Sequence, residues 1–496
     1  MAAVPAEPVA DLLHDPTAAY RVVSSRDARW DGRLFLGVVS TGVYCRPSCP
    51  ARTPRPENCR YYACAAAAVA AGFRACRRCR PDALPASRAD DHRSDLAARA
   101  LRLIRDGAVD EHGVGGVAAA LHVSERHLHR VLVEEVGVGP LRLAQSRRAQ
   151  LARLLVEQSE LGMTAVAFAA GFSSVRQFND VMRAEFGRPP SQLRTGTGGT
   201  DRRPRSGGPT LTLRLRYRDP YAVDAVWGFL GARLVPGVEW THPDGSLVRT
   251  VGAVGGPARV CVGRPSGGLV AVRLDLAELS DLAALVHTVR RWLDLDADPS
   301  AVDRVLGADR GLRRLVRRTP GIRVPGAISG FEMAVRAVVG QQVSVAAART
   351  VLGRLAADLG EQGVFPGATQ VAAGGETALR GIGLTGRRAR AVLALAQDAA
   401  SGRLVLDPGA DRDATRRHLR ALPGVGAWTV EYVALRALGD PDAWPEGDLV
   451  LRRRVRDARL DPARWRPWRG YGAMHLWTAT PSAANDAPTP STEESR

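Results

Sequence analysis

Two cysteine pairs near the N-terminus constrain the fold more than any other feature of this chain. Three residues separate Cys45 from Cys49, two separate Cys76 from Cys79, and 26 residues lie between the pairs. Two close pairs of thiols can surround one Zn²⁺ in a tetrahedron, and a metal bound in this way orders a short segment that lacks a large core. The pattern therefore predicts a small domain built around one Zn²⁺, with Cys45, Cys49, Cys76 and Cys79 as its ligands.

The residues around these pairs bear on what the metal does. Six of the seven cysteines lie between positions 45 and 79, which favours a metal site in a reducing compartment over a disulfide framework. Cys59 and Cys64 have no second pair of their own, so we expect them to be bystanders. Spacing alone favours a purely structural zinc. Eight arginines against one acidic residue, Glu57, between positions 45 and 80 would also suit a polyanion that approaches the site, and an arginine-rich composition is the alternative explanation.

The whole chain is basic, with a net charge of +18, which makes nucleic acid the expected partner. All 69 basic residues are arginine, and this also fits a genome-wide codon bias, so the charge alone does not decide the function. No apolar run approaches the roughly 18 residues of a membrane span. The N-terminus, "MAAVPAEPVADLLHD", lacks the charged and apolar regions of a secretory signal. We therefore expect a cytoplasmic protein with no membrane partner.

Composition also divides the chain into blocks. The segment 195–210 is rich in Gly, Pro, Ser and Thr, which predicts a linker, and 81–94 is a softer joint of the same kind. The end of the chain, 479–496, has the composition of a disordered tail. We therefore expect a cysteine block at 1–85, a helical block at 95–194 and a large third block at 211–478.

The helical block begins with one helix-turn-helix pattern. Residues 114–140 contain a short Ala-rich helix, a break near His122, and Ser124 as the N-cap of a second helix. In a DNA-binding protein such a second helix enters the major groove. A helical bundle with no role in DNA binding fits the same periodicity.

A second copy of this pattern covers residues 163–194. Here Thr164 is expected to cap the first helix, Gly171 to make the turn and Ser174 to begin the second helix. The segment between the two copies, 140–158, has apolar residues at helical spacing and predicts one connecting helix.

The cysteine block resembles the N-terminal domain of the Ada family of methylated-DNA sensors. The resemblance lies in "TGVYCRPSC", "RPEN" and "AGFRACRRCRPD". It implies that Cys45 is both a zinc ligand and the nucleophile that takes a methyl group from a DNA methylphosphotriester, and that Cys49, Cys76 and Cys79 complete the ligand set. A thiolate held by Zn²⁺ is nucleophilic at neutral pH. Methylation reduces the charge of the cluster from −2 to −1, which should raise its affinity for DNA phosphates.

The helical block is similar to the AraC-type DNA-binding domain, above all in "VAFAAGFSSVRQFNDVMRAEFGRPPSQLR". This resemblance implies two recognition helices on one face of promoter DNA, and RNA polymerase as a further partner of a monomeric regulator. The residues that match base-contacting positions are Glu125, Arg126 and His129 in the first helix and Ser174, Arg176 and Gln177 in the second.

The third block resembles the AlkA-type 3-methyladenine glycosylases of the helix-hairpin-helix superfamily. "LPGVGAWT" and "AWPEGDLVLRRRV" carry the resemblance, and "YAVDAVWGFLGARL" extends it into the β-rich N-terminal subdomain of that family. It implies a β-rich subdomain at 211–290 and a helical glycosylase domain at 291–478. The expected fold class is thus multidomain and mainly α, with α+β parts.

The glycosylase resemblance also assigns roles to residues. Asp448 matches the catalytic carboxylate, although its position also suits the N-cap of a helix. Gly424 and Gly426 match the hairpin whose N–H groups approach a DNA phosphate, and Gln342 matches the wedge that fills the gap left by a flipped base. The candidate pocket for that base consists of Phe229, Trp428, Tyr432 and Trp477, and plain core aromatics are the alternative for these four.

The chain contains no lysine. Glycosylases that also cut the strand use a lysine amine to form a Schiff base. The sequence therefore predicts a monofunctional glycosylase that leaves an abasic site and needs no cofactor. A transcription regulator whose glycosylase-like block only binds DNA is the alternative.

Overall fold

The computed structural model of the protein describes residues 12–13, 15–27, 30–83, 95–194 and 208–479. The predicted tail and most of the predicted linker and joint lie outside these residues. Among the described residues, no helix is long and apolar enough to cross a membrane.

A four-stranded sheet organises the cysteine block. Its strand order is β3-β1-β2-β4, and β4 pairs with β2 in parallel while the other pairs are antiparallel. The block is formed by α2 (Pro16–Ser24), β1 (Phe35–Val38), β2 (Val43–Cys45), β3 (Cys59–Tyr62), α3 (Ala65–Ala70) and β4 (Arg74–Ala75). Cys45 is the last residue of β2, so the sheet fixes its backbone position.

The helical block follows the sequence prediction closely. It consists of α4 (Asp95–Asp106), α5 (Ala108–Ala120), α6 (Glu125–Val136), α7 (Pro140–Gln158), α8 (Met163–Ala169) and α9 (Val175–Phe186). The connecting helix predicted over 140–158 is α7. Ser124 and Ser174 cap α6 and α9 through hydrogen bonds to His127 N and Gln177 N.

The turns of the two patterns are also as predicted, with one exception. His122 has φ +57° and Gly171 has φ +90°, so both chain reversals use the left-handed region. The prediction that Thr164 caps the first helix of the second copy was wrong. This helix, α8, begins at Met163, and its N-cap is Gly162, which has extended backbone angles and no side chain. Glycine is tolerated at an N-cap because water can satisfy the first N–H groups.

The third block starts with a five-stranded antiparallel sheet of order β5-β9-β8-β7-β6. Its strands are β5 (Thr210–Arg216), β6 (Glu239–Thr241), β7 (Leu247–Ala253), β8 (Gly256–Val262) and β9 (Leu269–Asp275). Leu211, Leu213 and Leu215 alternate with exposed residues along β5, so one face of the sheet is buried. Helix α10 (Val223–Gly231) follows β5 in the chain and contains Phe229.

The rest of the third block is helical. Its helices are α11 (Leu282–Trp292), α12 (Pro299–Ala308), α13 (Arg313–Arg318), α14 (Gly330–Val339), α15 (Val345–Leu359), α16 (Ala368–Gly381), α17 (Gly386–Ala400), α18 (Arg412–Ala421), α19 (Ala427–Arg436), α20 (Leu449–Asp457) and α21 (Arg469–Thr478). Two cores hold them together: one surrounds α14 and α17, and the other includes Phe229, Trp465 and Tyr471.

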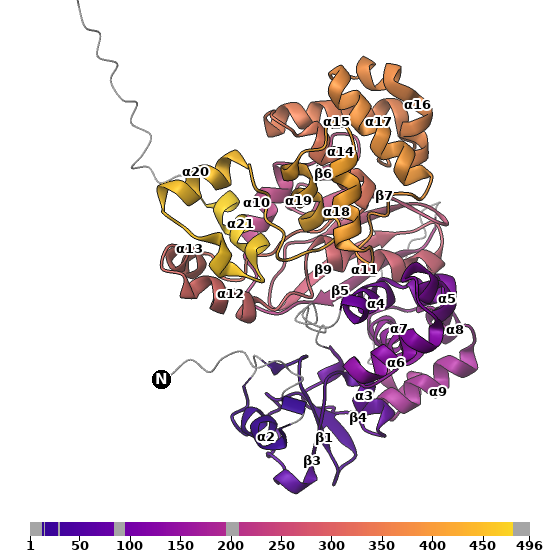
Figure 1. Ribbon diagram of the computed structural model, residues 1–496. Helices are drawn as coiled ribbons and strands as arrows, with labels where there is room; N and C mark the ends of the chain where they lie inside the picture. The colour runs from indigo at the N-terminus through magenta and orange to yellow at the C-terminus, as the bar shows by residue number, and fades with distance from the viewer. Residues whose placement is uncertain (1–11, 14, 28–29, 84–94, 195–207, 480–496) are drawn as a thin grey trace, which may run out of the picture.

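The three blocks pack against one another without a solvent gap between their cores. One hydrophobic cluster runs from Tyr44 in the cysteine block through Leu155 and Phe178 in the helical block to Leu213 in the five-stranded sheet. In Figure 1 the helical block lies between the cysteine block and the large third block.

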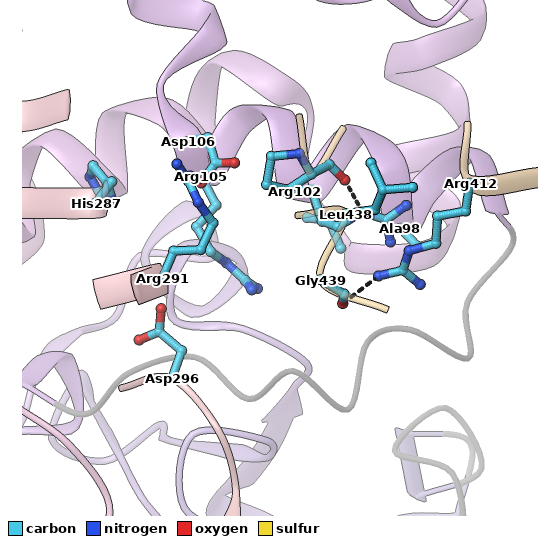
Figure 2. A pocket seen from close by; sticks show the side chains of 12 residues that line it. Ala98, Arg102, Arg105, Asp106, His287, Arg291, Asp296, Arg412, Leu438 and Gly439 are labelled. Atoms are coloured by element: carbon cyan, nitrogen blue, oxygen red, sulfur yellow. Dashed lines mark hydrogen bonds and ion pairs between the residues drawn. The ribbon is translucent and has the colours of Figure 1, made fainter. Parts of the chain in front are cut away.

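Helix α4 attaches the helical block to the third block. The Nε of Arg102 donates to Pro408 O at 2.7 Å, and Asp106 pairs with Arg291 at 3.0 Å. Figure 2 shows this junction, a pocket where α4 side chains face Arg291 of α11 and Arg412 of α18. Arg412 in turn donates to Gly439 O, just beyond α19, at 2.8 Å. Helix α4 therefore contacts the segment just before α18, and it lines one pocket together with the residues just beyond α19.

A buried acid makes the stability of the helical block depend on pH. Glu185 of α9 is fully buried; Ser146 donates to it at 3.0 Å and Arg142 lies 3.6 Å away. Burial raises the pKa of Glu185 from 4.5 to about 7. A carboxyl with a raised pKa contributes stability below its unfolded pKa and loses it as the pH rises through the folded value.

We therefore expect the free energy of local opening of α7 and α9 to fall between pH 5 and pH 8. Relative to Glu185→Gln, the fall should be about 2–3 kcal/mol. Amide hydrogen exchange in the two helices measures it. Parallel pH profiles for the wild type and the variant would contradict this prediction.

Candidate metal, DNA-binding and glycosylase sites

The four predicted zinc ligands lie together. The Sγ atoms of Cys45, Cys49, Cys76 and Cys79 are all within 4.8 Å of one another, as tetrahedral coordination with Zn–S bonds of about 2.3 Å requires. Hydrogen bonds that the Cys45 thiol donates to Cys49 and Cys79, together with burial, raise the pKa of Cys45. A divalent cation among the four sulfurs would favour the thiolate forms and overcome this effect.

Cys59 and Cys64 lie outside this group. The Sγ of Cys59 donates to Arg55 O at 3.3 Å, and that of Cys64 accepts from Ala67 N at 3.4 Å as the N-cap of α3. Both thiols thus have local structural contacts, in agreement with the bystander prediction.

Asp31 supports the loop between Cys45 and Cys49. Its buried carboxylate accepts from Ser48 N at 3.0 Å and from the Ser48 hydroxyl, and it pairs with Arg46 at 3.3 Å. Burial nevertheless raises the pKa of Asp31. Asp31 could not be predicted from the sequence, because nothing in its local pattern distinguishes it from a surface aspartate.

A chain of ion pairs connects the metal site to the helical block. Arg80, directly after Cys79, pairs with Glu157 of α7 at 3.0 Å. Arg153 of the same helix pairs with Glu157 at 2.9 Å and with Asp82 at 2.6 Å. The Arg153 guanidinium also lies 4.8 Å from the Phe186 ring centroid at the end of α9. Ion pairs therefore hold α7 against the cysteine block, and the contact between Arg153 and Phe186 adds α9 to this junction.

The candidate base-contacting residues differ in their exposure and in the hydrogen bonds that their side chains form. Arg126 and Arg176 are exposed on α6 and α9. The side chain of Gln177, in contrast, accepts hydrogen bonds from Ser173 N and Ser173 Oγ at 3.3 and 3.0 Å. Glu125 and His129 are exposed, and the side chain of each lies close to a glycine of its own domain. The side chain of Ser174 caps α9.

The helix-hairpin-helix motif lies between α18 and α19. Gly424 has φ +80°, a conformation that favours glycine, and Gly426 is the N-cap of α19. The hairpin therefore presents the N–H groups at the start of α19, the partial positive end of the helix.

The turn that follows α14 forms hydrogen bonds with this hairpin. Gln341 donates to Gly424 O at 3.1 Å and to Thr429 Oγ1 at 2.8 Å. Gln342, the candidate wedge, follows it, exposed and with φ +53°. Gln342 was predicted from the resemblance, whereas the hydrogen bonds of its neighbour Gln341 to the hairpin were not.

Asp448 is the N-cap of α20, and its carboxylate also accepts a hydrogen bond from a tryptophan of α19. Its Oδ1 accepts from Val450 N and Leu451 N at 3.0 Å and so caps α20, while its Oδ2 accepts from Trp428 Nε1 at 3.1 Å. Asp448 is half-buried. Leu449 and Val450 next to it are exposed apolar residues, with 77% and 46% of their surface accessible, as expected beside a surface that another molecule covers.

The four candidate pocket residues form one aromatic cluster beside this carboxylate. Trp428 stacks on Tyr432 with ring centroids 5.1 Å apart, Tyr432 meets Trp477 edge-on at 5.9 Å, and Trp477 stacks on Phe229 at 6.1 Å. These rings come from α10, α19 and α21, so the fold brings together residues from both ends of the third block.

Four known family models match this chain, at least one in each of its three blocks. The matched family models are a metal binding domain of Ada (residues 18–82), a helix-turn-helix domain (117–196), an AlkA N-terminal domain (212–329) and an HhH-GPD superfamily base excision DNA repair protein (335–466). A probable bifunctional transcriptional activator/DNA repair enzyme AlkA from Mycobacterium tuberculosis is 44% identical over 495 residues, which cover 96% of this chain and 99% of the relative. The chain belongs to this AlkA family of bifunctional proteins.

Two relatives from Escherichia coli correspond to its two parts. DNA-3-methyladenine glycosylase 2 is 33% identical over 277 residues, 53% of this chain and 95% of the relative. The bifunctional transcriptional activator/DNA repair enzyme Ada is 33% identical over 177 residues, 36% of this chain and 48% of the relative. The domains matched in this chain thus cover methyl sensing, DNA binding and 3-methyladenine glycosylase chemistry.

Proposed function

We propose that this protein combines three activities on DNA. It takes a methyl group from a methylphosphotriester onto Cys45, binds promoter DNA through α6 and α9, and excises alkylated purines of the 3-methyladenine type. The observation that carries the enzymatic part is the position of Asp448, whose carboxylate adjoins an aromatic cluster and the hairpin helix α19.

In the sensor, Cys45, Cys49, Cys76 and Cys79 would hold the Zn²⁺ that keeps their sulfurs deprotonated. The Cys45 sulfur attacks the methyl carbon and forms an S–C bond. The C–O bond breaks, and its electron pair stays on the phosphate oxygen, which restores an ordinary diester. Arg46 and the other arginines of this block bind the neighbouring phosphates.

In the glycosylase, the hairpin of Gly424 and Gly426 binds a phosphate of the damaged strand, and Gln342 fills the space left by the flipped nucleotide. The four rings enclose the base. As the N-glycosidic bond breaks, the negative charge of Asp448 stabilises the oxocarbenium character of the sugar, and water adds to its anomeric carbon. No cofactor takes part in these steps.

We further propose that the protein acts as a monomer on chromosomal DNA in the cytoplasm and that RNA polymerase is its partner at promoters. A single-turnover assay with N-methylated duplex DNA tests the enzyme, and mass spectrometry of Cys45 after incubation with methylphosphotriester DNA tests the sensor. Absence of base release by the wild-type protein would leave a regulator with a glycosylase-like DNA-binding block.

The excision reaction should stop at an abasic site. Because the chain has no lysine to form a Schiff base, borohydride should trap no covalent protein–DNA adduct, and the product strand should remain intact until alkali is added. Denaturing gel electrophoresis of the product with and without alkali measures this. Strand cleavage at the rate of base release would contradict the prediction.

A further inference from the structure

Two arginine-rich segments of the third block have no part in the mechanism above. Residues 303–318, which include α13, contain six arginines and two acidic residues, and residues 452–459 of α20 and the turn after it contain five arginines and one acidic residue. The whole chain has 69 basic and 51 acidic residues. A codon bias that replaces lysine by arginine does not remove acidic residues, so it does not explain this local excess of positive charge.

The two segments adjoin in the fold. Leu312 and Val316 of α13 and Leu451 of α20 are buried in the same hydrophobic core. Leu460, just after α20, lies so close to Gly311, at the start of α13, that no Cβ would fit there. In Figure 1 α12, α13, α20 and α21 lie together at the end of the third block opposite α16 and α17. Both helices therefore turn their apolar side chains toward one core and their arginines outward.

The acidic residues of these segments do not neutralise most of the arginines. Asp303 accepts from a backbone N–H at 2.9 Å, and Asp309 accepts from the Trp465 indole at 3.1 Å. Asp457 pairs with Arg456 at 3.0 Å. Five exposed arginines form no ion pair with a carboxylate of the described residues, and we call them the α13–α20 surface: Arg314, Arg317, Arg318, Arg452 and Arg459.

The positive charge is unfavourable for α13 itself. Arg314 and Arg318 stand four residues apart and therefore on the same face of a helix of six residues, and Arg313 and Arg317 repeat this spacing. Like charges at this spacing destabilise a helix, and a helix this short has little stability of its own. A polyanion bound to the surface would relieve the repulsion.

The α13–α20 surface is continuous with the proposed glycosylase site. Helix α20 begins next to Asp448, at the exposed apolar residues Leu449 and Val450, and its nine residues span about 13 Å, or about four base pairs of a duplex. We infer that the α13–α20 surface binds the phosphates of the duplex on one side of the lesion, from about four base pairs outward. This inference rests on the proposed excision of alkylated bases.

Single-turnover excision of 7-methylguanine from a long duplex, measured over a range of protein and salt concentrations, tests the surface. In Arg314→Gln/Arg317→Gln/Arg318→Gln the half-saturating protein concentration should rise about tenfold. The slope of its logarithm against the logarithm of the salt concentration should fall by about 2 to 3, since each phosphate contact contributes about 0.9. The maximal rate should stay within about twofold of wild type. Thermal stability should not fall, because repulsion within α13 is removed.

The length of the duplex then locates the contact. The wild type and the glutamine variant are compared on duplexes that keep only four base pairs on one side of the lesion, in both orientations. On one of these shortened duplexes the two proteins should have the same half-saturating concentration, because the phosphates that reach α13 are missing. A tenfold difference that persists on both shortened duplexes would overturn the inference.

Two further variants control for net charge and for fold. Arg259→Gln/Arg264→Gln/Arg273→Gln removes the same three charges from exposed positions on and beside β8 and β9, and its half-saturating concentration should stay within about twofold of wild type. Replacement of the three α13 arginines by lysine should restore binding to within about threefold, because lysine also binds phosphate.

The remaining outcomes separate the surface from the proposed function. An unchanged half-saturating concentration in the glutamine variant of α13 would overturn the inference and favour an acidic protein as the partner of this surface. Absence of excision by the wild type would overturn the proposed function. The salt slope of duplex binding, measured by fluorescence anisotropy for the wild type and the glutamine variant, would still decide whether the surface binds DNA.

Discussion

Replacement of Asp448 by asparagine should lower the single-turnover rate of alkylated-base excision by about a thousandfold, equivalent to about 4 kcal/mol of transition-state stabilisation. Asparagine has nearly the same shape, and its oxygen can still accept from Val450 N and Leu451 N, so helix α20 stays capped. The negative charge that stabilises the oxocarbenium character is lost. The effect should therefore appear in the rate of chemistry, while DNA affinity changes little.

The matched control is Asp461→Asn. Asp461 also caps a helical turn, through Ala463 N at 3.0 Å, but lies on the exposed surface. This variant should excise bases at a rate within about twofold of wild type, and both variants should lose no more than about 1 kcal/mol of stability from the altered cap. If the two substitutions reduced the excision rate equally, the role of Asp448 would be helix capping alone.

Replacement of Cys45 by serine should abolish methyl uptake from methylphosphotriester DNA and weaken zinc binding. A serine hydroxyl stays protonated at neutral pH, and it is a poor nucleophile and a poor ligand for Zn²⁺. Mass spectrometry should detect a single methyl adduct in the wild-type protein and none in the variant. Zinc content, measured by a chelator-release assay, should fall because one of four ligands is lost.

Cys59→Ser provides the comparison. Cys59 is as buried as Cys45 but donates to Arg55 O and lies outside the group of four sulfurs. This variant should keep both its zinc and its methyl uptake. Loss of zinc from Cys59→Ser would require a different ligand set from the one proposed.

Local sequence signals predicted the helices and turns well where each depends on nearby residues. The limits of α7 and the caps Ser124 and Ser174 follow from apolar spacing and from side chains that can accept a hydrogen bond three residues on. Thr164 failed as a cap because α8 begins two residues earlier than a cap at Thr164 would place it, with Gly162 in the cap position.

The site was less predictable where it depends on contacts between distant segments. Asp448 and the four rings could be named from the resemblance, but the hydrogen bond from Trp428 to Asp448 joins residues on two different elements. Arg436 and Arg153 gave no signal, because in a chain with 69 arginines no pattern identifies the few that are buried. Only the fold shows that Arg436 lies against the Phe229 ring and that Arg153 pairs with Asp82 of the cysteine block.

The hydrophobic cluster that runs from Tyr44 through Leu155 and Phe178 to Leu213 limits how the three blocks can be separated or exchanged between homologous proteins. A truncation at either predicted boundary cuts through this cluster and leaves apolar side chains in water on both fragments. Isolated blocks of this chain should therefore aggregate more readily than a freely tethered domain would. Exchange of one block between homologous genes should succeed only when the facing side chains of its neighbour are transferred with it.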